Sequence, residues 1–92
     1  MDLKVRIEST VDEVISILEK HEKGAILRNF YYFKKMFKYA ELIDIQYEIQ
    51  KIYGGMGSFN DLVLDKDGKM LIEENRHLSK LKNILFSLIT DH

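Results

Sequence analysis

The segment with the most distinctive residue types is Gly-Gly-Met-Gly-Ser-Phe-Asn-Asp, at residues 54–61. Three glycines in four positions permit positive φ angles and let successive backbone N–H groups converge on an anion. A phosphate-binding P-loop is disfavoured, because no Lys-Ser or Lys-Thr pair follows. We therefore predict a tight helix-to-strand connection in which Met56 and Phe59 enter the core, with anion binding as the alternative. The residues of this structural motif are Gly54, Gly55, Met56, Gly57, Ser58, Asn60 and Asp61, and the last three should bond the turn backbone.

Other residues capable of catalysis or metal binding do not form recognised patterns. The chain has no Cys, and its three His residues lack metal-ligand spacing. Residues 63–74 partly match an EF-hand loop, but Val63 occupies its first ligand position. Ser58 lacks the Gly-x-Ser-x-Gly context of a hydrolase nucleophile. We predict no catalytic residue, no metal site and no cofactor.

Residues 25–39 combine a net charge of +4 with excess aromatic residues. Ile26, Phe30, Phe33 and Phe37 form one apolar stripe, which leaves tyrosines outside it. Tyrosines beside basic residues are typical of protein interfaces, and also of surfaces that stack nucleic-acid bases. The alternative is a wide buried face with lysine stems along its edges. The candidate partner-binding residues are Tyr31, Tyr32, Lys34, Lys35 and Lys38.

Residues 55–74 have the opposite charge, −3, although the whole chain carries only −1. Carboxylates at a turn tip could face a basic partner such as a nuclease active site. A solvated turn is the alternative interpretation. The candidate acidic contacts are Asp61, Asp65 and Asp67.

Hydrophobic periodicity predicts the elements that position these residues. A first helix covers 11–21, with Thr10 and Glu13 as a capping box, and we favour helix over strand for residues 2–8. Gly24 should lie just beyond its C-terminus. Further helices are expected at 25–39, 40–53 and 74–90. A hairpin should join 62–64 to 70–72 through a type I turn with a Gly bulge. The prediction is a single domain over residues 1–92, mainly α, with about four helices and a short antiparallel hairpin before the last.

The Gly-rich segment, followed by Leu62-Val63-Leu64, resembles a family of small uncharacterised bacterial proteins. Its members share Gly-Gly-Met-Gly-Ser, an aliphatic residue, Asn-Asp and a strand, and an Asn before a Leu-rich terminal helix, as at Asn75. The resemblance covers roughly residues 40–90. The family commonly has Trp in its second helix, which this chain lacks. The resemblance implies a mainly helical fold, no assigned enzyme activity and a relation to accessory proteins encoded beside toxins.

Composition sets the remaining limits on function. The chain has 92 residues, of which 46% are hydrophobic, and no apolar run approaches the length of a membrane span. We expect a cytoplasmic, non-catalytic protein-binding module without a membrane partner. Its expected partner is a cognate bacterial toxin that it neutralises, as immunity proteins of the contact-dependent growth inhibition type do. A nucleic-acid-binding or regulatory protein using the second helix is the alternative, although near-zero charge makes nucleic acid an unfavoured partner. A homodimer is also left open.

Overall fold

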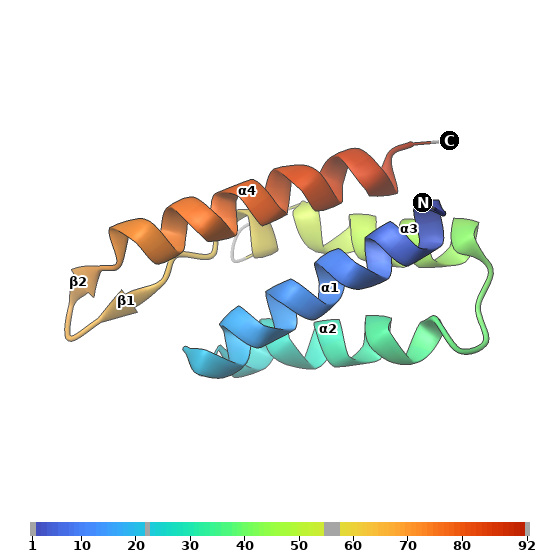
Figure 1. The fold of residues 1–92 in the computed structure, drawn as a ribbon. Helices are drawn as coiled ribbons and strands as arrows, with labels where there is room; N and C mark the ends of the chain where they lie inside the picture. The colour runs from blue at the N-terminus through green and yellow to red at the C-terminus, as the bar shows by residue number, and fades with distance from the viewer. Residues whose placement is uncertain (1, 22, 55–57, 92) are drawn as a thin grey trace.

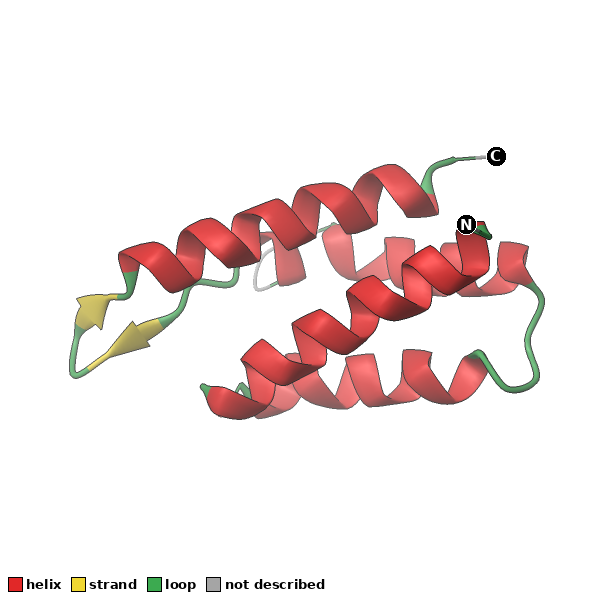
Figure 2. Ribbon diagram, viewed as in Figure 1, coloured by secondary structure: helices red, strands yellow, loops and turns green. Residues whose placement is uncertain are grey.

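Four α-helices make up most of the computed structural model, which describes residues 2–21, 23–54 and 58–91 (Figure 1). They are α1 (Leu3–Lys20), α2 (Gly24–Met36), α3 (Leu42–Gln50) and α4 (Ile72–Ile89). Two 3₁₀ helices, η1 (Lys51–Tyr53) and η2 (Phe59–Asp61), lie between α3 and the hairpin strands β1 (Asp65–Lys66) and β2 (Lys69–Met70). Figure 2 shows how little of the molecule is strand. The predicted fold class, mainly α with a short hairpin before the last helix, is confirmed.

Helix α1 includes the N-terminal residues for which both strand and helix were considered. The Asp2 carboxylate accepts a hydrogen bond from the Lys4 N–H at 3.3 Å and caps the helix. The favoured helix for residues 2–8 is confirmed, and Ile7, one turn before Val11, is fully buried. The capping box at Thr10 was therefore wrong. Thr10 lies within the helix, and its hydroxyl donates to the Arg6 carbonyl at 2.9 Å.

The boundaries of the next two helices also differ from the predicted ones. Gly24 is the first residue of α2 rather than a left-handed residue after α1, and its φ is not positive. α2 ends at Met36, three residues early, and a turn follows it. α3 begins at Leu42 and tightens into η1 after Gln50. Residues 25–53 contain no Pro or Gly, so the sequence carries no local signal for the end of α2 or the start of α3.

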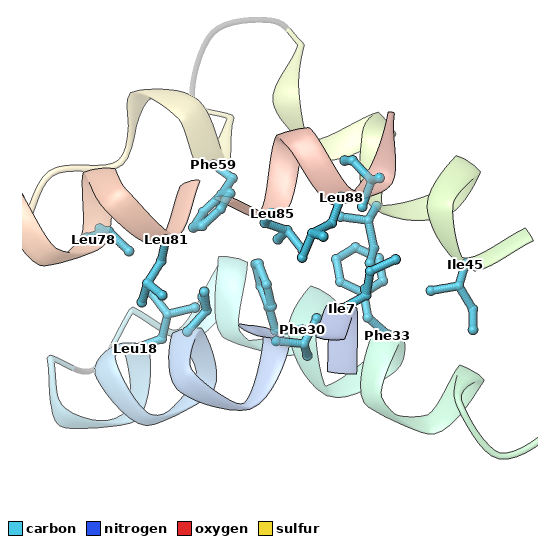
Figure 3. Packing of buried hydrophobic residues seen from close by; sticks show 14 of the residues in the cluster. Ile7, Leu18, Phe30, Phe33, Ile45, Phe59, Leu78, Leu81, Leu85 and Leu88 are labelled. Atoms are coloured by element: carbon cyan, nitrogen blue, oxygen red, sulfur yellow. The ribbon is translucent and has the colours of Figure 1, made fainter. Parts of the chain in front are cut away.

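The core forms where the apolar stripes of α1 and α4 meet, with α2 and α3 completing it (Figure 3). The fully buried side chains include Val11 and Val14 of α1 and Leu85 of α4. Phe59 of η2 inserts between the helices, and its ring lies 4.9 Å from that of Phe30 in an edge-to-face arrangement. Phe59 thus enters the core as predicted, whereas Met56 lies outside the described residues.

Buried amides of α3 bind the C-terminal end of α4. Gln46 is only 2% exposed, and its Nε2 donates to the carbonyls of Leu88 at 3.1 Å and Asp91 at 2.8 Å. Gln50 Nε2 donates to the Ile89 carbonyl at 2.9 Å. The last carbonyls of a helix have no intrahelical partner, so these bonds satisfy them while fixing α3 against α4.

The hairpin is shorter than predicted, and its turn is of a different type. The ladder pairs Asp65 with Met70 and Lys66 with Lys69, which leaves Asp67 and Gly68 as a two-residue loop. Their φ values of 52° and 79° are those of a type I′ turn, not of a type I turn with a bulge. Type I′ turns match the right-handed twist of paired strands, and Asp-Gly is among their preferred sequences.

Asn75 of α4 attaches the hairpin to the helices. Its Oδ1 accepts from the Leu64 N–H at 2.8 Å, and its Nδ2 donates to the carbonyls of Leu64 at 2.7 Å and Leu71 at 2.8 Å. The Leu71 N–H also donates to the Leu64 carbonyl at 3.0 Å. A side-chain amide therefore supplies the pairing that a longer strand would give, and Leu64 is held fully buried in the core.

Candidate protein-binding surface

Four of the exposed large side chains of α2, α3 and their connection form a surface that we call the aromatic face. They are Tyr32 (47% exposed), Tyr39 (70%), Ile43 (58%) and Tyr47 (63%). Tyr32 lies on α2, Tyr39 in the turn that follows, and Ile43 and Tyr47 one turn apart on α3. Tyr32 was a predicted partner-binding residue, and the structure places it here. Ile43 and Tyr47 were missed, although both lie off the apolar stripe of the third helix.

Polar contacts surround Tyr47 on α3, and electrostatic effects connect this region with Tyr32 of α2. The Lys51 ammonium lies 4.9 Å from the centre of the Tyr47 ring and 3.0 Å from the Glu48 carboxylate. Its bond to Glu48 raises the pKa of Lys51. The nearby Tyr39 hydroxyl is the main cause of a raised pKa at Tyr32, and the Glu48 carboxylate acts in the same direction. Side chains of α2, the turn and α3 are therefore neighbours.

The predicted basic residues of α2 divide into one that is bound within the chain and two that are not. Lys34 Nζ lies 2.8 Å from a Glu8 oxygen and 2.9 Å from an Asp12 oxygen, both on α1, and these bonds raise its pKa. Lys35 and Lys38 are exposed, and neither forms an ion pair in the described part of the chain. Lys34 thus joins two helices, while Lys35 and Lys38 face solvent.

Tyr31 lies at the α1 edge of α2. Its hydroxyl donates to the Glu19 carboxylate at 2.5 Å, and this bond is the main cause of the raised pKa of Tyr31. The side chain is 41% exposed. Its hydroxyl therefore helps to hold α2 against α1, and only the ring is available to a partner.

The predicted acidic contacts are distributed over another part of the molecule. Asp65 and Asp67 lie in the hairpin, which projects beyond the N-terminal end of α4 and away from the α2–α3 connection (Figure 1). Asp65 lies 3.4 Å from Lys23 Nζ, and Asp67 occupies the exposed turn. Asp61 ends η2. The structure does not bring these carboxylates together with the tyrosines and lysines of α2.

The described residues of the Gly-rich segment have structural contacts. Gly54 follows η1 in an extended conformation, and Ser58 precedes η2, where its carbonyl accepts from the Asp61 N–H at 3.0 Å. The Asn60 carbonyl accepts from Lys82 Nζ at 3.2 Å. Gly55, Met56 and Gly57 lie outside the described residues. The segment was predicted to connect a helix directly to a strand. In the structure the 3₁₀ helix η2 comes between the segment's glycines and the strand β1.

Lys82 of α4 is a residue whose importance the sequence reading missed. Only 9% of it is exposed, and its Nζ donates to the Leu62 carbonyl at 2.7 Å as well as to that of Asn60. The ammonium lies 5.7 Å from the centre of the Phe59 ring. Burial lowers the pKa of Lys82, while the Asp61 carboxylate acts in the opposite direction. The sequence did carry a signal for this burial, because Lys82 lies within the apolar stripe that Leu78, Leu81 and Leu85 form on α4.

Tyr53 of η1 lies beside Lys82 in a shallow hollow of about 330 Å³, which Asn60, Asn83 and Phe86 also line. Its hydroxyl donates to the Lys82 carbonyl at 2.9 Å, and its ring packs edge-to-face against those of Phe59 and Phe86. Burial raises the pKa of Tyr53 well above its usual value of 10. These contacts tie η1 and η2 to α4.

Across residues 2–21, 23–54 and 58–91, no three His, Asp or Glu side chains are arranged to hold a metal ion. None of the helices in that part of the chain could cross a membrane.

The fold defines the class of this chain as a small helical domain, and a family comparison places it further. The family model described as "Domain of unknown function (DUF6966)" matches residues 10–72, about two thirds of the chain. The chain belongs to this family. No curated protein and no solved structure matched it. The matched residues include the whole aromatic face and the Gly-rich segment, whereas nearly all of α4 lies beyond them.

Proposed function

We propose that the chain is a non-catalytic protein-binding module that docks its partner on the aromatic face. The observation that carries the proposal is the exposure of Tyr32, Tyr39 and Tyr47 on neighbouring elements, with Ile43 between them in sequence. Tyrosines are enriched among the residues that dominate binding energy at protein interfaces. Each combines a large apolar ring with a hydroxyl, so the face is suited to a partner that is partly apolar and partly polar.

The partner that we propose is a bacterial toxin domain, which the chain would neutralise as an immunity protein. This step rests on the resemblance of residues 40–90 to accessory proteins encoded beside toxins. The rigidity of the support favours it, because α2 is held to α1 through Lys34 and α3 is held to α4 through Gln46 and Gln50. A face fixed in this way loses little conformational entropy on binding.

A growth-rescue experiment tests the proposal. The toxin domain encoded beside the gene would be expressed in bacteria alone, with the wild-type chain, and with variants that keep their helical circular dichroism. We expect the wild type to restore growth and a Tyr39→Ala/Tyr47→Ala double variant to lose rescue and binding together. Met70→Ala is the matched control, because Met70 is 62% exposed but lies on the hairpin. Absence of an adjacent toxin, or of binding by the wild type, would refute the proposal.

Nucleic-acid binding through α2 is the alternative function, and a lysine double variant tests it. Lys34 is already bound by two carboxylates of α1, and the Glu48 carboxylate of α3 helps to raise the pKa of Tyr32, so acidic side chains accompany the lysines near the face. Anisotropy with labelled duplex DNA and single-stranded RNA should therefore show no salt-dependent binding. Binding that weakens with salt and is lost in Lys35→Ala/Lys38→Ala would favour a nucleic-acid function instead.

A further inference from the structure

Five charged side chains of α2, the turn after it and the start of α3 fall into two groups. Arg28, Lys35 and Lys38 come before Tyr39 in sequence, on α2 and the turn; Glu41 and Asp44 come after it, at the start of α3. All five are exposed, and among the described residues none of them forms an ion pair. α2 and the turn therefore carry a basic half of this surface, and the start of α3 carries an acidic half.

This division of charge is self-complementary. α2 and α3 run in roughly opposite directions on either side of their connection (Figure 1). A two-fold axis near Tyr39 would place the basic half of one copy on the acidic half of another and bring the exposed tyrosines together at the centre. A closed dimer of identical chains needs such a patch, since the same surface serves both partners. An aromatic centre with a charged rim is also the usual anatomy of an interface.

We propose that in the free protein a second copy of this chain covers the aromatic face, forming a two-fold dimer that the protein partner must displace. Lys35 and Lys38 of each copy face Glu41 and Asp44 of the other, while Tyr39 and Tyr47 fill the centre. Displacement of the second copy by a protein partner rests on the proposed function, whereas the dimer itself is inferred only from the charges and exposed tyrosines of the surface. Self-association thus regulates how much of the docking face is available, because the dimer population rises with chain concentration.

Charge reversal gives a direct test by sedimentation velocity over a roughly hundredfold range of protein concentration. We expect the wild type to shift from monomer to dimer within that range. Lys35→Glu/Lys38→Glu makes both halves acidic, and Glu41→Lys/Asp44→Lys makes both halves basic. Each variant alone should dissociate at least about tenfold more readily, because like charges then face each other across the axis. A mixture of the two should recover the dimer, and so should the quadruple variant.

A control variant on the hairpin and a variant at the centre of the face locate the interface. Lys66→Glu/Lys69→Glu reverses two lysines on the hairpin and should leave self-association unchanged. Tyr39→Ala/Tyr47→Ala should abolish the dimer without altering circular dichroism. A wild type that stays monomeric throughout, or a dimer that both charge reversals leave intact, would overturn the proposal.

Failure of the dimer is distinguishable from failure of the proposed function. A monomeric wild type whose toxin rescue still depends on Tyr39 and Tyr47 would remove the dimer and keep the binding module. A dimer that follows the charge-reversal pattern, in a chain that binds no toxin, would support self-association and remove the immunity function.

Discussion

Replacing Lys82 by methionine should measure what holds the Gly-rich segment to the last helix. Methionine keeps the apolar stem beside the Phe59 ring but removes the ammonium that donates to the carbonyls of Asn60 and Leu62. The expected effect is a less stable fold in which residues 58–62 detach from α4 more often. Lys80→Met is the matched control, because Lys80 lies on the same helix and is exposed.

The size of this effect follows from the surroundings of the two carbonyls. Asn60 is exposed, so water can replace the lysine at its carbonyl, whereas Leu62 is half-buried. A carbonyl left without a partner costs about 1–3 kcal/mol. Burying a charge is itself unfavourable, as the lowered pKa of Lys82 shows, and methionine removes that cost. We expect a net loss of about 1–2 kcal/mol, or a fall in Tm of roughly 5–15 °C for a domain of this size.

Thermal and urea unfolding of wild type, Lys82→Met and Lys80→Met would give these differences, and amide hydrogen exchange would locate them. Exchange at residues 59–62 should accelerate in Lys82→Met and stay unchanged in the control. If Lys82→Met were as stable as Lys80→Met, the buried ammonium would be contributing nothing beyond its stem, and the reasoning would fail.

Three further perturbations test the hairpin and the buried tyrosine. Asn75→Ala removes three hydrogen bonds to Leu64 and Leu71 and should cost about 2–3 kcal/mol in urea unfolding. The Leu64 amide hydrogen should also exchange faster, and an unchanged exchange rate would contradict the role of Asn75 in holding the hairpin. Gly68→Ala should cost about 1 kcal/mol in the same assay, because the φ of Gly68 is +79°, although an added Cβ would meet no atom within 4 Å. Gly68→Asn should cost less, because Asn adopts positive φ more readily than Ala. Equal stability of the wild type and both variants would exclude backbone strain. Burial raises the pKa of Tyr53, so the Tyr53 hydroxyl loses its proton at lower pH in the unfolded chain than in the folded one. The free energy of unfolding should therefore fall above about pH 10, by up to about 1.4 kcal/mol per pH unit. Tyr53→Phe should flatten that fall in urea titrations, and an unchanged slope would assign it to other groups.

The helical body was predictable because apolar spacing is a property of each segment alone. Phe30 and Phe33 of the stripe predicted in residues 25–39 are buried as expected. Helix ends were harder to predict because several residues compete to form them. Thr10 and Glu13 matched a capping box, but the helix continues upstream through the buried Ile7 and is capped by Asp2. The hairpin position followed from Asp-Gly, but its type I′ form also depends on strand register.

The candidate site was predictable only in part, because exposure and pairing depend on contacts between distant segments. Tyr32, Lys35 and Lys38 are exposed as an interface requires, but Lys34 is held by carboxylates 22 and 26 residues away. Asp65 likewise has a lysine neighbour from another element, Lys23. Segment charges of +4 and −3 therefore overstated the charge of the surfaces, since neither sum includes the residues that fold against it.

The contacts of α4 give residues 59–62, at the end of the Gly-rich segment, a structural role that requires no ligand. Phe59 fills the core, and the carbonyls that follow it are bound by Lys82. Asn75, on the same helix, holds the hairpin that comes next. The family match ends at residue 72, so Asn75 and Lys82, which secure the matched segment, both lie outside it. A chain cut at that boundary would keep the tyrosines of the aromatic face but lose the amide and ammonium contacts beneath the motif. Binding to the face should therefore require α4, although α4 contributes none of the four side chains that define it.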